Sequence, residues 1–286
     1  MPEKFRNIIR VIDPQPVLEG AGVRLKRSIA THELNYLDPF LLFDDFSSDN
    51  PADYTAGFPM HPHRGIETVT YILAGVVTHK DSLGNSGDIK GGDVQWMTSG
   101  SGIMHEEMPK PENGKMAGFQ LWVNLPAKLK MSQPRYQDIA SGDIPVIKTD
   151  NGVKVRVISG QFDGVSGPVT EITINPAYLD VDVPPDRTFL YPVEENHSVF
   201  AYVFEGEGRF GITEEEKGKL IKAKKLLIFG KGDRVKIRTE DNSVRFLLVS
   251  GKPINEPIAR YGPFVMNTSE EIQQALADLQ NGTFIK

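Results

Sequence analysis

The chain has 286 residues, with 32 Lys and Arg against 38 Asp and Glu, so its formal net charge is −6. This acidic balance argues against a general nucleic-acid-binding protein, which needs a basic face to neutralise phosphates. The chain contains no cysteine, which excludes disulfides, thiolate zinc sites, iron–sulfur clusters and cysteine nucleophiles. Any metal must therefore be held by histidines, carboxylates or backbone oxygens.

Hydropathy indicates neither a membrane span nor a leader. No stretch approaches about 18 consecutive apolar residues, and the N-terminus lacks the apolar run of a signal peptide. We therefore expect a soluble cytoplasmic protein, nuclear as well if its source is eukaryotic. We also expect a monomer with no membrane contact and no direct contact with nucleic acid.

Short runs rich in β-branched and aromatic residues recur along the chain, at residues 67–73, 118–123, 154–158 and 199–204. Their close spacing predicts an all-β sandwich or barrel rather than a doubly wound α/β fold. One helix is expected near the C-terminus, where Thr268 and Glu271 form a capping box. Apolar residues at helical spacing follow this box, and Gly282 supplies a stop.

The two halves of the chain resemble each other. Residues 70–75 are similar to residues 201–206, and residues 91–94 are similar to residues 231–234. A period this long indicates duplicated domains rather than a solenoid. We place the domains at 1–132 and 133–286, and residues 143–152 are a second candidate for the joint.

Five ligand-capable side chains stand at alternating positions: His61, His63, Glu67, His105 and Glu107. In an extended chain, residues i and i+2 point to the same side. His61, His63 and Glu67 can therefore share one face of a strand, and His105 and Glu107 can share one face of another. If their strands are neighbours in a barrel, the donors converge in a set that suits iron, manganese, nickel, copper or zinc. Pro62 predicts an edge strand or a strand start, because proline cannot donate to a sheet ladder.

Other polar and aromatic residues have more ordinary interpretations. His32 and His79 lie in polar contexts, and we expect both on the surface. Trp96 and Trp122 lie in strand-like runs, where core packing is favoured over an aromatic wall near a metal. The basic group at residues 24–27 is expected on a solvated face, with a partner contact as the alternative.

The histidine segments resemble cupin motifs. The pattern Gly57-(x3)-His61-x-His63-(x3)-Glu67-(x7)-Gly75 resembles the first cupin motif, and residues 92–105 resemble the second. More narrowly, the chain resembles the pirin family, in phrases at residues 37–44, 61–65, 93–98, 105–109, 120–125 and 262–268. The resemblance implies a bicupin of two stacked β-barrels of the double-stranded β-helix or jelly-roll type, with a short C-terminal α-helix. It also makes Asp44-Asp45 a structural turn.

The resemblance implies one iron, as Fe²⁺, in the N-terminal barrel, although other divalent metals suit the same donors. In pirins the ligands correspond to His61, His63, His105 and Glu107. A general cupin would use Glu67 in place of Glu107. We prefer the pirin set because Glu107 lies two residues from His105 and the Met-Pro that follows matches. Glu67 then becomes a residue that orients an imidazole.

The C-terminal half shows no comparable donors. The repeat aligns His61 and His63 with Pro192 and Glu194, and it aligns His105 and Glu107 with Arg245 and Leu247. We therefore expect a second barrel without metal ligands.

The resemblance to pirin-like proteins implies two alternative functions. The first is a dioxygenase that opens flavonols such as quercetin, with Glu107 as the catalytic base that accepts the 3-hydroxyl proton. Reaction with dioxygen then opens the ring and releases carbon monoxide. We expect the pocket wall to come from Phe43, Phe46, Met97 and Phe119.

The second function is a non-enzymatic, iron- and redox-dependent interaction protein that binds a protein partner as a transcriptional co-regulator. We favour the enzyme, because a mononuclear metal with open positions provides a stated mechanism.

Overall fold

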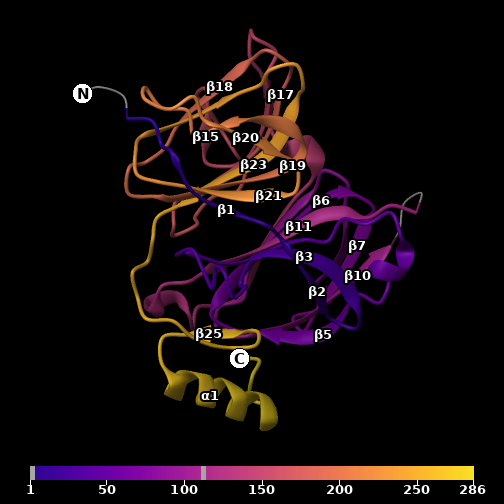
Figure 1. Cartoon of the computed structure of the whole chain (residues 1–286). Coiled ribbons are helices and arrows are strands. Elements are labelled where there is room, and N and C mark those ends of the chain that lie inside the picture. The colour runs from indigo at the N-terminus through magenta and orange to yellow at the C-terminus, as the bar shows by residue number, and fades with distance from the viewer. Residues whose placement is uncertain (1–3, 111–113) are drawn as a thin grey trace. The chain divides into compact units, whose positions relative to one another are not determined.

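The computed structural model describes residues 4–110 and 114–286. Strands dominate this part of the chain, and its one α-helix is α1 (Ser269–Gln280), close to the C-terminus (Figure 1). The expected all-β architecture with a C-terminal helix is confirmed. No helix in the described ranges is long and apolar enough to cross a membrane.

The chain forms two compact units that each combine separate segments. The first unit joins Gln15–Ser141 with Ile254–Lys286, and the second joins the N-terminal residues through Pro14 with Gly142–Pro253. Each unit therefore takes one terminal segment from the far end of the sequence.

The first unit contains a seven-stranded and a four-stranded antiparallel sheet. In sheet order, the larger sheet consists of β12 (Arg135–Ile139), β9 (Val94–Thr98), β6 (Ile66–Ala74), β11 (Ala117–Asn124), β4 (Phe40–Asp45), β3 (Val23–Ile29) and β2 (Gln15–Glu19). The smaller sheet consists of β5 (Phe58–His63), β10 (Ile103–Lys110), β7 (Val76–Asp81) and β8 (Ser86–Lys90). One apolar cluster includes residues of both sheets, such as Leu25, Ile72 and Val77, so the sheets enclose a shared core.

The alternation of side chains along β10 turns the predicted metal ligands toward the interior. Along β10, the buried residues Ile103, His105 and Glu107 alternate with more exposed neighbours. His105 and Glu107 therefore share one face of this strand. β5 is the edge strand of its sheet, which confirms the edge position that Pro62 predicts.

Within the first unit, the C-terminal segment packs against the remaining strands through β24 (Ala259–Tyr261), β25 (Phe264–Met266) and α1. Thr268 caps α1, and its hydroxyl and the Glu271 carboxylate each accept a backbone N–H of the other residue. Apolar residues of β25 and α1 form a cluster with Phe284. The guanidinium of Arg64, which directly follows His63, donates to Asp278 of α1 at 2.8 Å.

The second unit is built on a ten-stranded sheet with its own apolar core. Its strands are β1 (Ile8–Ile12), β13 (Val146–Lys148), β14 (Lys154–Ser159), β17 (Ala177–Val183), β18 (Thr188–Pro192), β19 (Ser198–Phe210), β20 (Lys219–Lys222), β21 (Lys225–Phe229), β22 (Arg234–Arg238) and β23 (Val244–Gly251). A small hairpin is formed by β15 (Gln161–Phe162) and β16 (Val165–Ser166). Arg245, which the repeat aligns with His105, pairs with Asp180 at 2.7 Å.

Short 3₁₀ turns complete the described chain: η1 (Pro51–Asp53), η2 (Ala127–Leu129) and η3 (Ser141–Asp143). All three lie in loops between strands.

Candidate metal centre

The three predicted histidine ligands come from two neighbouring strands. β5 and β10 pair antiparallel, with His105 opposite His61 and Ile103 opposite His63. The register then shifts, so that Glu107 faces Phe58. Directly opposed residues on one face of a ladder bring their side chains together, which explains why distant segments meet here.

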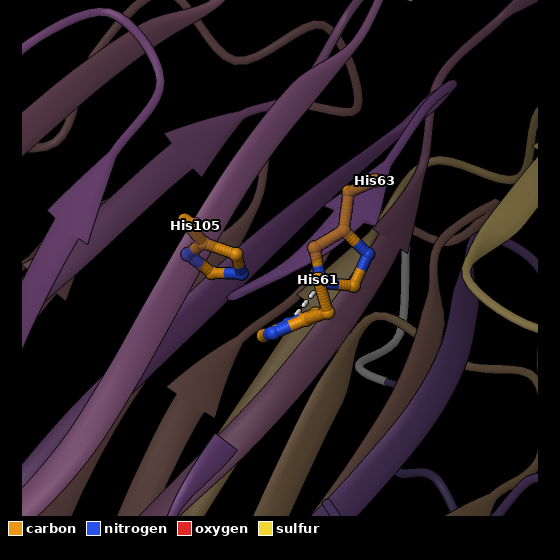
Figure 2. A group of neighbouring side chains, drawn as sticks. All are labelled: His61, His63 and His105. Atoms are coloured by element: carbon orange, nitrogen blue, oxygen red, sulfur yellow. Dashed lines mark hydrogen bonds between the residues drawn. The ribbon is translucent and has the colours of Figure 1, made fainter. Parts of the chain in front are cut away.

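Figure 2 shows the rings of His61, His63 and His105 pointing toward one another. One ring nitrogen from each lies within 4.8 Å of the others. Nε2 of His61 and Nε2 of His63 are 3.1 Å apart, within hydrogen-bond distance. The ring centroids of His105 lie 4.4 Å from His61 and 5.0 Å from His63.

All three imidazoles favour the neutral form. Burial lowers the pKa of His105 to about 4, and burial with the neighbouring His105 charge lowers the pKa of His61 and of His63. Neutral imidazoles have the lone pairs that a metal requires. Both ring nitrogens of His105 are buried without a hydrogen-bond partner in the described ranges. Such orphaned nitrogens are costly unless a ligand satisfies them, so the residues fit a metal ion.

Glu107 lies beside this cluster in a buried environment. It lines the same cavity as His61 and His63, and one carboxylate oxygen accepts a hydrogen bond from Thr70 Oγ1 at 3.1 Å. Burial raises the pKa of Glu107, and the His61 charge opposes this shift. The carboxyl group is therefore a stronger proton acceptor, once ionised, than an exposed glutamate.

The carboxylate of Glu67 forms hydrogen bonds with residues other than the histidines. It accepts hydrogen bonds from Trp96 Nε1 at 3.1 Å and Thr98 Oγ1 at 2.9 Å. Among the described residues, no imidazole is a partner of this carboxylate, and Glu67 is not part of the cavity lining. The structure thus shows no contact through which Glu67 would orient a histidine.

The centre opens into a cavity of 480 Å³, within the size range of small-molecule sites. Its aromatic lining comprises Phe46, Tyr54, Phe58 and Trp122. Of the expected wall residues, only Phe46 is correct. Phe43, Met97 and Phe119 are fully buried outside the cavity, and Phe43 stacks on Phe119 at 5.8 Å. The alternation of β4 explains the error, because Leu42 and Asp44 face the cavity and Phe43 faces away.

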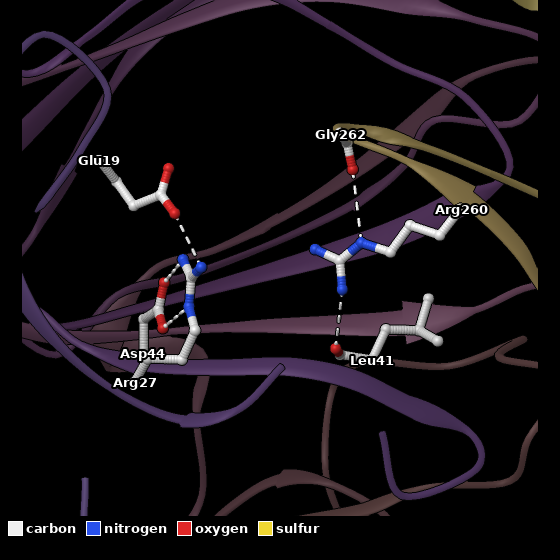
Figure 3. Close-up of polar contacts among 6 residues, drawn as sticks. All are labelled: Glu19, Arg27, Leu41, Asp44, Arg260 and Gly262. Carbon is white, nitrogen blue, oxygen red and sulfur yellow. Dashed lines mark hydrogen bonds and ion pairs between the residues drawn. The ribbon is translucent and has the colours of Figure 1, made fainter. Parts of the chain in front are cut away.

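A cluster of charged groups lines another part of this cavity (Figure 3). Arg27 and Asp44 are cross-strand partners on β3 and β4, joined by two hydrogen bonds of 2.7 and 2.8 Å. Asp44-Asp45 therefore ends a strand and does not form the expected turn. Arg27 is also not on a solvated face, since its side chain is only 13% exposed.

Two other sequence-based expectations were partly wrong. His32 is exposed as expected, but His79 is buried in β7, opposite Glu107, and stacks on Tyr136 at 5.8 Å. Trp96 packs in the core as expected. Trp122 instead lines the cavity, with its ring 5.0 Å from that of His63.

Several cavity residues were not identified from the sequence, among them Thr70 and Arg260, and for Trp122 a wall position was only the less favoured alternative. Thr70 lies on β6 next to Gln120 of β11, and Trp122 follows on the same face of β11. Period-two alternation could have identified both once the strands were aligned. Arg260 comes from a segment far along the chain, shortly before Gly262. The only sequence signal for it is that it lies next to residues 262–268, which resemble the pirin family.

Comparison with known proteins is consistent across the chain. The Pirin family model matches residues 22–123, and the model of the Pirin C-terminal cupin domain matches residues 178–285. A pirin-like protein of Caulobacter vibrioides is 44% identical over 280 residues, covering 98% of this chain and 99% of the relative.

Solved structures agree with these matches. A crystal structure of quercetin 2,3-dioxygenase from Acinetobacter baumannii is 35% identical, covers 98% of both chains and superposes with a TM-score of 0.87. A bacterial pirin of Escherichia coli in complex with nickel(II) shares the fold, with a TM-score of 0.64 and 19% identity over 85% of this chain and 98% of that one. These matches confirm the two-cupin fold. The chain belongs to the pirin family.

Proposed function

We propose that this protein is an iron-dependent dioxygenase that opens flavonols such as quercetin, an oxidoreductase of the quercetin 2,3-dioxygenase type. The observation that carries the proposal is the cluster of three neutral imidazoles, two of which, His61 and His63, line an aromatic cavity of 480 Å³. The similar Acinetobacter structure, which bears this activity in its name, supports it.

The residues proposed to hold the metal are His61, His63, His105 and Glu107. Three nitrogen donors and one oxygen donor suit Fe²⁺, and they also suit other divalent transition metals. The orphaned nitrogens of His105 support this set, as does the engagement of Glu67 by Trp96 and Thr98. When bound, the metal would supply Lewis-acid and redox chemistry for the reaction with dioxygen.

Glu107 is the proposed base. Burial raises its pKa, which makes the ionised carboxylate a better acceptor for the 3-hydroxyl proton of a flavonol than an exposed glutamate. Thr70 Oγ1 donates to one oxygen and so orients the carboxylate, whose remaining lone pairs would serve the metal and the incoming proton.

The cavity wall positions the substrate. Phe46, Tyr54, Phe58 and Trp122 present flat apolar surfaces of the kind that hold fused aromatic rings. Their burial of the rings would exclude water from the reacting carbon atoms.

The decisive test is quercetin-dependent oxygen uptake by ferrous-reconstituted protein, with His63→Ala as the control. We expect uptake by the native protein and its loss in the variant. An absence of uptake in protein that carries one iron per chain would contradict dioxygenase activity on flavonols, and would favour the iron-dependent interaction protein.

A further inference from the structure

A second cavity, of 880 Å³, lies within the second unit and borders its apolar core. All of its lining residues fall between Ser159 and Ser250, and three of them, Ala177, Tyr191 and Val193, belong to that core. Its volume is in the range of small-molecule sites. The cavity contains none of the residues proposed to hold the metal, so any ligand here binds independently of the first unit's histidines.

Strand alternation turns two hydroxyl groups toward this cavity. Tyr191 shares the inward face of β18 with Phe189, and Ser250 shares the inward face of β23 with Leu248. Both hydroxyl-bearing residues line the cavity, and they are only 6% and 3% exposed. Neither hydroxyl has a hydrogen-bond partner among the described residues. Both are therefore available to a ligand.

His197 adds a third buried polar group to the same lining. It is 7% exposed, and its ring nitrogens have no hydrogen-bond partner in the part of the chain that the structure describes. Burial lowers the pKa of His197, against the opposing charge of Glu194. The neutral imidazole offers one donor and one acceptor.

Arg6 holds the turn that carries His197. Its Nη2 donates to the carbonyl oxygens of Glu194 and Glu195 at 2.8 and 3.1 Å, and its Nη1 donates to the carbonyl oxygen of His197 at 3.0 Å. Arg6 is 2% exposed, so these bonds are shielded from water. The turn is therefore fixed before a ligand arrives, which reduces the entropy that binding costs.

The charges of the lining disfavour an anion. Four carboxylates line the cavity, and Arg234 is the only arginine or lysine among the described lining residues. The carboxylates belong to Glu171, Glu194, Glu195 and Asp233. A cation is also poorly suited, because the three buried polar groups carry no charge that would offset its desolvation.

A hydroxyl-rich ligand fits these groups. Each ligand hydroxyl can both donate and accept, so it can pair with a tyrosine, a serine or an imidazole. The apolar lining residues Val169, Ile172 and Val193 suit the C–H faces of a saturated ring. Hydroxyl groups around such a ring would satisfy several of the free polar groups at once.

The internal repeat places this cavity beside a familiar segment. The repeat aligns His61 and His63 with Pro192 and Glu194, and both of the latter line the cavity. The segment that carries metal ligands in the first unit thus borders a cavity in the second unit, where other residues replace the histidines.

We propose that the second unit carries a binding site for a small, neutral, cyclic polyol of the sugar class, which Tyr191, His197 and Ser250 recognise by hydrogen bonds. The site operates without a metal. It does not depend on the proposed dioxygenase function, so either proposal can fail alone.

The test is saturation-transfer-difference NMR on the whole chain, with glucose, myo-inositol and maltose as probes. We expect at least one polyol to bind with a dissociation constant below about 10 mM, as a few hydrogen bonds between neutral groups provide. Putrescine is the cationic probe, and it should bind at least about tenfold more weakly than that polyol.

Tyr191→Phe and Ser250→Ala each remove one hydroxyl group from the cavity. Each variant should bind the polyol about threefold to tenfold more weakly. Since neither hydroxyl has a partner within the described chain, neither change should lower the midpoint of urea unfolding. His197→Leu should weaken binding as well, and His197→Gln, which keeps a donor and an acceptor, should retain more of it.

Ser243→Ala is the matched control. Ser243 is an exposed serine of the same unit outside the cavity lining, so this variant should bind the polyol like the native protein. Weaker binding in Ser250→Ala but not in Ser243→Ala, at an unchanged unfolding midpoint, supports the site.

Three results would overturn the inference. The first is that none of the three polyols binds, and the second is that putrescine binds more tightly than they do. The third is that binding is unchanged in Tyr191→Phe, Ser250→Ala and His197→Leu. A loss of binding that appears only together with a lowered unfolding midpoint would assign these residues a structural role instead.

Discussion

His61 lies directly opposite His105 across the ladder between β5 and β10, and the two ring centroids are 4.4 Å apart. Burial keeps both rings neutral, and neither nitrogen of His105 has a hydrogen-bond partner in the described ranges. An unpaired buried polar group costs free energy in the metal-free protein. The arrangement is therefore suited to binding a cation rather than to stabilising the empty fold.

His105→Ala tests this interpretation. The variant should bind Fe²⁺ or Ni²⁺ at least about 100-fold more weakly. Loss of a residue that only hydrogen-bonds a metal ligand already lowers metal affinity by about 10–100-fold, and His105 is proposed as a ligand itself. Competition with a coloured chelator measures the affinity. His32→Ala, which removes an exposed histidine, should bind like the native protein. Equal affinities in the two variants would exclude His105 as a ligand.

The choice between Glu107 and Glu67 is tested by a pair of isosteric changes. Glu107→Gln should weaken metal binding by about tenfold or more, since it removes the carboxylate beside the histidines. Glu67→Gln should leave metal affinity unchanged and lower the free energy of unfolding by about 1 kcal/mol, through weaker bonds to Trp96 and Thr98. Chelator competition and urea unfolding measure the two effects. Loss of metal in Glu67→Gln alone would identify Glu67 as the ligand.

Asp44 predicts a pH dependence of stability. Burial raises its pKa from 3.8 to about 6, against the opposing effect of Arg27. Between these values the folded state holds a proton that the unfolded state has released. The contribution of Asp44 to stability is therefore complete below about pH 4 and is lost as the pH rises through 6, by at most about 1.4 kcal/mol per pH unit.

The measurement is urea unfolding of the native protein and of Asp44→Asn from pH 4 to pH 7. Subtracting the two curves removes the titration of the other groups. We expect the native protein to lose stability relative to the variant as the pH rises over this range. A difference that does not change with pH would contradict a raised pKa for Asp44.

The histidine cluster was predictable because its signal is local. His61, His63 and His105 lie at strand spacing within recognisable motifs, and the two-residue period of a strand places each group on one face. The all-β class and α1 were predictable for the same reason, since residue composition and the capping box act over a few positions.

The rest of the cavity depends on long-range pairing. A polar context suggested a loop for His79, whereas pairing of β7 with β10 buries it opposite Glu107. The choice of Phe43 over Leu42 as a wall residue is wrong by one position, and a shift of one reverses the face of a strand. Arg260 reaches the cavity from a segment more than 200 residues beyond Arg27, and β1 pairs with β21 over a similar separation. Local sequence patterns carry no information about such pairings.

The ion pair between Arg64 and Asp278 couples α1 to the strand that bears the histidines. Arg64 is 1% exposed; its Nε donates to the Ser101 carbonyl, and its guanidinium lies 4.4 Å from the Phe284 ring. Hydrogen bonding from Arg64, and then from Gln274, lowers the pKa of Asp278, so this carboxylate is ionised at neutral pH.

Asp278→Ala would leave the buried guanidinium without its counter-charge. Removal of one partner of a buried pair costs about 3–5 kcal/mol. We expect the amides of α1 to exchange with deuterium much faster in this variant, because the lost pair lowers the free energy of opening of the helix. Glu270→Ala, which removes an exposed carboxylate from the first turn of α1, should cost less than about 1 kcal/mol. Similar exchange rates in both variants would show that Arg64 does not hold the helix in place.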